Sequence, residues 1–97
     1  MNELEFIWDP AKAELNQRKH GVSFEEATTA FRDFNGLRMY DPEHSDSEDR
    51  FVLLGVSVKL RLLVVVHCFR EPGEIIRIIS ARKATRRESA QYEKRLP

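Results

Sequence analysis

The chain has 97 residues, of which 41% are hydrophobic and 33% are charged. A chain of this length buries roughly 60–65% of its unfolded surface, which predicts one small domain spanning residues 1–97. The longest apolar run, residues 62–66, is far shorter than the roughly 18 residues of a membrane span. The acidic start, MNELEFIW, and the single cysteine, Cys68, predict a cytoplasmic protein without an internal disulfide or a paired-cysteine zinc site.

The formal net charge is zero, but the charges are divided unequally along the chain. The first 49 residues carry twelve acidic and five basic side chains, whereas the remaining 48 carry four acidic and eleven basic ones. This asymmetry predicts that one face of the domain attracts an anion. Only the second half of the chain therefore supports an argument for nucleic-acid binding.

The first third of the sequence predicts two helices joined by a very short connection. Asp9 and Pro10 are typical of a helix start and Gly21 of a helix end, which predicts a helix over 10–20. We expect its apolar side to consist of Ala11, Leu15 and the stem of Arg18.

The second helix begins at a capping box formed by Ser23 and Glu26. The Glu26 side chain is expected to reach back to the Ser23 N–H. The helix is predicted to run to about Phe31, with Phe24, Ala27 and Phe31 on one buried side.

From Leu37 the apolar period changes from 3.6 to 2, which predicts a four-stranded antiparallel sheet. The expected strands cover residues 37–40, 51–59, 61–69 and 75–82. The first is expected at an edge, and the third is expected at the centre because 64–66 are consecutive valines. The polar stretch 41–49 predicts a loop or a single helical turn.

Thr85 and Glu88 form a second capping box, which predicts a C-terminal helix over 86–95. The predicted fold is therefore α+β, with two N-terminal helices, a four-stranded antiparallel sheet and a C-terminal helix.

Four cationic residues gather at the start of that last helix, namely Arg82, Lys83, Arg86 and Arg87, opposed only by Glu88. Each cation there is disfavoured by about 0.3–1 kcal/mol, because a helix N-terminus carries partial positive charge. Free helix N–H groups and guanidinium groups together suit a phosphate, so we expect a phosphate or an acidic partner at this point. The alternative is that these side chains point into water and interact with the acidic half of the same chain.

His67 and Arg77 are polar residues inside otherwise apolar strands. A three-residue loop over 71–73 pairs them directly, and we expect this register. A two-residue loop pairs His67 with Ile78 instead and sends the two polar side chains to opposite faces. Next to Arg77, His67 would stay neutral and available as a base near pH 7. The alternative is a half-buried histidine bonded to a backbone carbonyl.

Three further positions have open interpretations. Lys19 and His20 lie in the last turn of the first helix, where cations compensate the helix dipole, and Arg61 is either an exposed edge charge or a substrate contact. His44 has no companion at metal-ligand spacing. The sequence lacks paired carboxylates, a nucleophile elbow and a glycine-rich phosphate loop, which excludes the common hydrolase and nucleotidyl classes.

The chain resembles BrnT toxins, the ribonuclease component of bacterial type II toxin–antitoxin modules, in four blocks that occur in the same order. The blocks are FIWDPAKAELNQRKHGVSFEEA at 6–27, DPEHSDSEDRFVLLG at 41–55, RLLVVVH at 61–67, and RIISARKATRRE with the following YE at 77–93. The resemblance implies a RelE-like fold and RNA cleavage without a metal or cofactor. It also implies neutralisation by a BrnA-type antitoxin, in a complex that binds operator DNA and represses its own operon.

The resemblance singles out eight residues, namely Lys19, His20, Arg61, His67, Arg77, Arg82, Lys83 and Arg86. We expect His20, His67, Arg77 and Arg82 to be catalytic, and Lys19, Arg61, Lys83 and Arg86 to bind the flanking phosphates. In such a reaction the RNA 2′-hydroxyl attacks its own phosphate, with His67 or His20 as base or acid and Arg77 and Arg82 balancing the transition-state charge. Which histidine is the base and which is the acid stays open, as does a proton transfer through the basic groups without a histidine. An alternative function also stays open: a non-catalytic module that binds antitoxin or nucleic acid. The oligomeric state is open too, with a homodimer or a heterotetramer with the antitoxin as the candidates.

Overall fold

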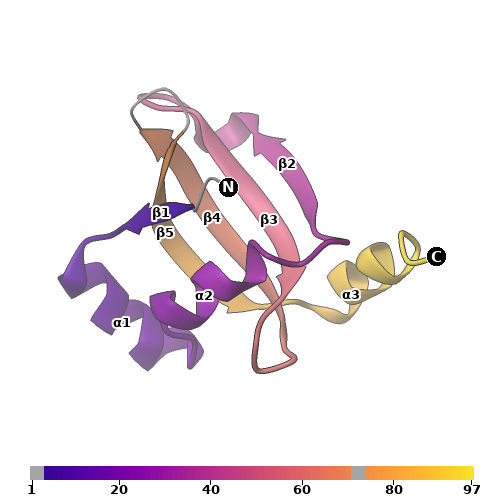
Figure 1. Ribbon diagram of the computed structural model, residues 1–97. Helices are drawn as coiled ribbons and strands as arrows, with labels where there is room; N and C mark the ends of the chain where they lie inside the picture. Colours follow the sequence, from indigo (N-terminus) through magenta and orange to yellow (C-terminus); the bar gives the residue numbers. More distant parts are fainter. Residues whose placement is uncertain (1–3, 71–73) are drawn as a thin grey trace.

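The computed structural model describes residues 4–70 and 74–97. Figure 1 shows the elements in chain order. They are β1 (Glu5–Ile7), α1 (Pro10–His20), α2 (Phe24–Ala30), β2 (Leu37–Asp41), the 3₁₀ turn η1 (Pro42–His44), β3 (Arg50–Val56), β4 (Leu62–Arg70), β5 (Ile75–Lys83) and α3 (Arg86–Glu93). None of these helices is long and apolar enough to cross a membrane.

The strands form one mixed sheet in the order β1-β5-β4-β3-β2. The four expected strands pair antiparallel, with β4 at the centre and β2 at an edge, as predicted. The prediction of a purely antiparallel, four-stranded sheet is wrong, because β1 pairs parallel with β5. This strand has only three residues, too few to show an alternating pattern, and it depends on a partner about 70 residues along the chain.

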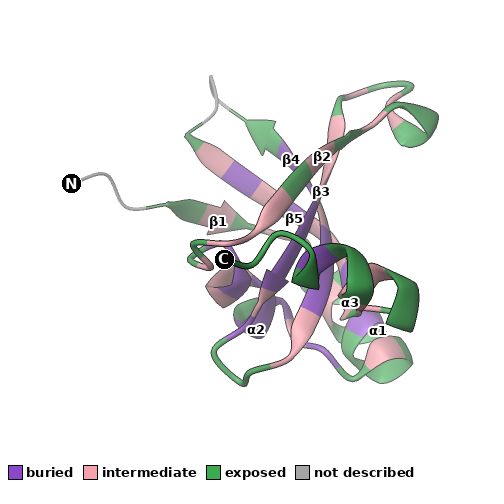
Figure 2. Ribbon diagram, turned by 90° about the vertical axis from the view of Figure 1, so that its right-hand side faces the viewer, coloured by how far each residue is buried: buried purple, intermediate pink, exposed green. Residues whose placement is uncertain are grey.

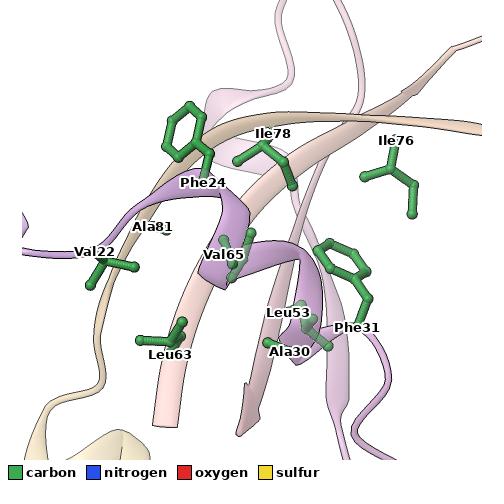
Figure 3. Packing of buried hydrophobic residues seen from close by; sticks show 11 residues of the cluster. Val22, Phe24, Ala30, Phe31, Leu53, Leu63, Val65, Ile76, Ile78 and Ala81 are labelled. Atoms are coloured by element: carbon green, nitrogen blue, oxygen red, sulfur yellow. The ribbon is translucent and has the colours of Figure 1, made fainter. Parts of the chain in front are cut away.

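The two faces of the sheet are covered differently. We call the side that bears Leu53, Leu63 and Val65 the α2 face, because these side chains pack with α2 in the main core. Figure 3 shows the side chains of α2 meeting those of the strands. The opposite α3 face carries a smaller cluster in which Leu54 and Val64 contact Tyr92 of α3. Figure 2 shows buried segments along the central strands and mostly exposed segments on α1 and α3.

Helix α1 begins and ends as predicted but faces the sheet with a different side. The Asp9 carboxylate accepts the Ala11 N–H at 2.9 Å, and Gly21 adopts a φ of 70° at the C-terminal end. Ala11 and Leu15, expected on the buried side, are exposed, and the buried residue of the helix is Asn16.

Asn16 closes the part of the β5 edge that β1 does not cover. Its Nδ2 donates to the carbonyls of Ala81 at 2.8 Å and Val22 at 3.0 Å, and its Oδ1 accepts the Ala81 N–H at 3.1 Å. The side chain thus satisfies main-chain groups of β5 as a neighbouring strand would. A polar side chain is tolerated at this buried position because its amide supplies hydrogen-bond partners to buried main-chain groups.

The register between β4 and β5 corrects the expected pairing of His67. His67 lies opposite Ile78 and Cys68 lies opposite Arg77, so the predicted His67–Arg77 pair is wrong. This is the pairing of the two-residue alternative, although residues 71–73 themselves lie outside the described residues. The ladder shifts by one residue between Val66 and His67, which leaves Ile79 as an extra residue of β5.

His67 lies fully buried on the α2 face among the rings of Phe31, Phe51 and Phe69, whose centroids are 4.8, 6.2 and 5.5 Å away. Its Nδ1 donates to the Val65 carbonyl at 3.0 Å, and its Nε2 has no hydrogen-bond partner among the described residues. Burial lowers the pKa of His67 to about 4. The imidazole is therefore neutral at pH 7.

Replacing Asn16 tests how strongly it stabilises the edge of β5. In Asn16→Ala, the main-chain groups of Ala81 and Val22 lose their partners, and each buried unpaired group costs about 1–3 kcal/mol. We expect the free energy of unfolding to fall by about 3 kcal/mol in urea titrations. Gln17→Ala, on the exposed side of α1, serves as the control with an expected change below about 0.5 kcal/mol. Equal effects of the two substitutions would contradict this role.

The buried His67 predicts a loss of stability in mild acid. Its folded pKa of about 4 lies below the ordinary value of 6.5, so the stabilisation is complete above pH 6.5 and is lost as the pH falls towards 4. The full effect is about 3 kcal/mol. We expect His67→Leu to lose less unfolding free energy than the parent between pH 7 and 4.5, measured by urea titration at each pH. Identical pH slopes for both proteins would show that His67 takes up no proton on unfolding.

Candidate functional site

Two adjoining pockets lie on either side of the C-terminal half of β5. The edge pocket, of about 590 Å³, lies between α1 and β5 and is lined by Lys12, Leu15, Asn16, Arg18, Lys19, His20, Ile79 and Ser80. The face pocket, of about 360 Å³, lies on the α3 face and is lined by Met39, Tyr40, Asp41, Val52, Val64, Val66, Ser80, Arg82 and Glu88. Ser80 lines both, so the two pockets adjoin at this residue.

The register shift in β5 positions these pockets. Beyond the extra residue Ile79, Ser80 lies opposite Val66 and Arg82 lies opposite Val64. Side chains alternate along a strand, so Ser80 and Arg82 project from the same α3 face as the two valines. The valines form the apolar floor of the face pocket, and Ser80 and Arg82 provide polar groups at its side.

The last turn of α1 supplies the basic side of the edge pocket. Lys19 and His20 precede Gly21, which ends the helix in a left-handed conformation, and both line the pocket together with Lys12 and Arg18. Cations are favoured at this end of a helix, which applies to Lys19 and His20, whereas Lys12 lies in the first turn and Arg18 is paired with Glu14. Figure 1 shows this end of α1 near the C-terminal half of β5.

Arg82 is paired with a carboxylate of its own chain. Its Nη1 and Nη2 donate to the two oxygens of Glu88 at 2.8 and 2.9 Å. Glu88 also accepts the Thr85 N–H at 2.8 Å, and Thr85 Oγ1 accepts the Glu88 N–H at 3.2 Å, so the predicted capping box is confirmed. The hydrogen bonds from Arg82 are the main cause that lowers the pKa of Glu88 to about 2.

Arg61 lies outside both pockets. From its position just before β4, it bonds to Glu26 of α2 and to the Gly21 carbonyl at the end of α1. The Ser23 hydroxyl accepts the Glu26 N–H as predicted, but the Glu26 carboxylate does not reach back to Ser23. It is buried and accepts from Arg61 Nε at 2.9 Å and from the Ser57 hydroxyl at 2.7 Å. Arg61 also donates to the Gly21 carbonyl at 3.1 Å. The bond from Arg61 is the main cause that holds the pKa of Glu26 below its usual value.

Arg77 also lies away from the two pockets, further along the α3 face of β5. Its Nη1 donates to Glu48 at 3.2 Å, and the thiol of the buried Cys68 lies 3.5 Å from the same carboxylate. Three of the arginines predicted to bind phosphate, Arg61, Arg77 and Arg82, are thus each paired with a carboxylate of this chain.

The other predicted site residues are distributed over the surface and the core. Lys83 and Arg86 are exposed where β5 ends and α3 begins, and no ion pair joins either to a carboxylate in the described ranges 4–70 and 74–97. His67 has no exposed surface, so RNA cannot contact its imidazole in this structure. Of the eight predicted residues, the pockets bring together Lys19, His20 and Arg82.

Several polar residues of the pockets were not predicted as site residues, among them Ser80 and Glu88. Ser80 has no unusual sequence context, and its position depends on the register shift. Glu88 is predicted as a capping residue and as the acid that opposes four cations, but not as a site residue. Its position six residues after Arg82 is a signal for an ion pair across the strand–helix turn.

Comparison with known proteins identifies the family. The sequence model described as "Ribonuclease toxin, BrnT, of type II toxin-antitoxin system" matches residues 8–88. The chain is similar to the crystal structure of the Brucella abortus ribonuclease toxin BrnT, with 25% sequence identity and a TM-score of 0.58 over 87% of this chain and 100% of that chain. No curated protein matches the sequence. The match over 8–88 includes α1, the whole β2–β5 region and the Arg82–Glu88 pair, and the chain therefore belongs to the BrnT family of ribonuclease toxins of type II toxin–antitoxin systems.

Proposed function

We propose that this chain cleaves RNA without a metal ion, by attack of a 2′-hydroxyl on the adjacent phosphate at the surface formed by the two pockets. The observation that carries the proposal is that Ser80 joins a pocket with four basic side chains to a pocket that holds Arg82 and Glu88. A polyanion can lie along such a surface with phosphates near the basic groups. Membership of a ribonuclease family supplies the substrate class.

The reaction needs a base, positive charge near the phosphate and an acid for the leaving 5′-oxygen. Arg82 is the guanidinium in the face pocket and would bind the phosphate oxygens in the transition state. His20 is the predicted catalytic histidine that lines a pocket, and it would donate the proton to the leaving oxygen. Lys19 would bind the next phosphate along the strand.

The remaining predicted residues take different parts in this proposal. Lys83 and Arg86 are exposed beside the face pocket and would attract the flanking RNA through long-range electrostatics. Arg61 and Arg77 would support the fold through their ion pairs with Glu26 and Glu48.

Regulation by an antitoxin is the second part of the proposal. A BrnA-type antitoxin would cover the basic surface, and the complex would bind operator DNA and repress the operon in the cytoplasm. The membership of a toxin–antitoxin family supports this partner. The free edge of β2 offers a place for a further strand from the antitoxin or from a second copy of the toxin.

One observation favours a second function, a module that binds RNA or antitoxin without cleaving it. The guanidinium of Arg82 is already occupied by Glu88, so the free protein has no open guanidinium in the face pocket. A binding module would need only the electrostatic attraction of the edge pocket.

Cleavage of single-stranded RNA separates the two functions. We expect the purified chain to cleave RNA in the presence of EDTA and to leave 2′,3′-cyclic phosphate and 5′-hydroxyl ends, detected by mass spectrometry. His20→Gln and Arg82→Ala should lower kcat/KM by about 100-fold or more, because each removes a group that acts in the transition state. Glu93→Gln, at an exposed position of α3 outside both pockets, should cleave like the parent. Intact RNA that binds tightly would support the binding module instead.

The salt dependence of RNA binding tests the edge pocket. Each phosphate contact on a single strand contributes about 0.7 to the slope of log K against log salt. The double variant Lys12→Gln/Lys19→Gln should therefore lower the slope by up to about 1.4, measured by fluorescence anisotropy with a non-cleavable 2′-deoxy oligonucleotide. Lys94→Gln, at the far end of α3, is the control that should keep the parent slope. An unchanged slope in the double variant would place the RNA elsewhere.

A further inference from the structure

The proposed cleavage leaves the acceptor of the 2′-hydroxyl proton unassigned, and we propose that the carboxylate of Glu88 is this general base. The inference rests on the proposed function, because it concerns the same reaction at the same surface. It makes Glu88 a catalytic residue in addition to the cap of α3. Neither family membership nor the sequence motifs assign this role.

The position of Glu88 fits the geometry of the reaction. In RNA, the attacking 2′-oxygen and the phosphorus belong to the same nucleotide and are separated by three bonded atoms. The base and the group that binds the phosphate must therefore lie side by side. Glu88 meets this requirement, since its two oxygens lie 2.8 and 2.9 Å from the guanidinium of Arg82, in the same pocket.

The pocket leaves both side chains accessible to a substrate. The side chain of Glu88 is 27% exposed and that of Arg82 is 40% exposed, above a floor that contains Val52, Val64 and Val66. The sugar of a nucleotide can pack on this apolar floor while its 2′-hydroxyl faces the carboxylate. Glu88 also accepts the Thr85 N–H, a second contact that does not come from Arg82.

Substrate binding changes the basicity of Glu88 in the required direction. In the free protein, both terminal nitrogens of Arg82 donate to Glu88, and these bonds are the main cause of its low pKa of about 2. A phosphate competes for the same guanidinium, because arginine binds phosphate through the same pair of N–H groups. As the phosphate takes Arg82, Glu88 loses its strongest donor and its pKa rises. The carboxylate thus becomes a stronger base when an RNA phosphate is present.

The step balances with groups already named. The 2′-oxygen gives its proton to the Glu88 carboxylate and forms a bond to phosphorus, while the bond from phosphorus to the 5′-oxygen breaks. The leaving 5′-oxygen takes a proton from His20, in the pocket on the other side of Ser80. The products are a 2′,3′-cyclic phosphate and a 5′-hydroxyl. No oxidant, reductant or other reactant is consumed.

The groups that face Glu88 come from three elements. Arg82 from β5 and Thr85 at the start of α3 contact it directly, and Tyr40 and Asp41 from β2 line the same pocket. Asp41 is the other carboxylate of the pocket, but its Oδ2 is bonded to His44 Nδ1 at 2.9 Å. Glu88 is favoured as the base because it is the carboxylate that contacts Arg82.

Glu88→Gln tests the inference with little change to the fold. Glutamine keeps the side-chain length and the oxygen that accepts the Thr85 N–H, since Gln also completes a capping box, but it cannot take up the proton. We expect kcat to fall at least 100-fold and KM to stay within about threefold of the parent. The acid limb of the kcat profile, where the parent gains activity as the base deprotonates, should be lost. Glu93→Gln, an exposed residue of the same helix, is the control with parent activity.

A second variant separates a chemical role from a structural one. In Glu88→Ala, added acetate should restore part of the cleavage, because a free carboxylate can enter the vacated space and act as the base. A side chain needed only to cap α3 gives no such rescue. Circular dichroism and the Tm of each variant establish that α3 is still folded.

The outcomes distinguish this inference from the proposed function. If the parent cleaves RNA and Glu88→Gln cleaves within threefold of it, the inference is overturned while the proposed function stands. Loss of activity in Asp41→Asn together with retention in Glu88→Gln would overturn it in favour of Asp41. A parent protein that leaves RNA intact overturns the proposed function itself.

Discussion

The one-residue shift between β4 and β5 is the constraint on which the site depends. Before it, β5 directs Ile76 and Ile78 into the main core; beyond the extra residue Ile79, Ser80 and Arg82 project from the opposite face. A regular ladder would continue the earlier register and move these side chains out of phase with the valines of β4. The bulge therefore lets one strand serve the core and the pockets, as bulges beside functional sites commonly do.

Several arginines of the chain are paired with its own carboxylates, at different depths below the surface. The Glu26–Arg61 pair connects the start of α2 with the β3–β4 hairpin, and its carboxylate is almost fully buried. Breaking such a pair leaves a buried charge without a partner, at a cost of several kcal/mol. The Arg82–Glu88 pair is more exposed and therefore easier for a phosphate to open. This difference in burial separates Arg61, whose carboxylate partner is buried, from Arg82, whose partner is partly exposed.

Local signals in the sequence predict most of the fold but only part of the site. Caps at Asp9 and Thr85 fix the starts of α1 and α3, and the valine run fixes the central strand. The buried side of α1 could not be predicted, because Asn16 bonds to a residue 65 positions away. Lys19 and His20 are singled out by the family resemblance and Arg82 by a local cluster of cations, and the structure places these three residues at the two pockets. Whether an arginine is free or paired depends on tertiary contacts. The carboxylate partners of Arg61 and Arg77 could therefore not be predicted from the sequence.

Asn16 has a consequence for how the sheet can grow. On one side of the sheet, β1 offers only three residues, and the amide of Asn16 already occupies the main-chain groups of Ala81 further along β5. On the other side, β2 presents five residues with a free outer edge among the described strands. Extension is thus one-sided: two copies that meet through β2 would form a closed pair around a twofold axis and leave no equivalent edge for a third.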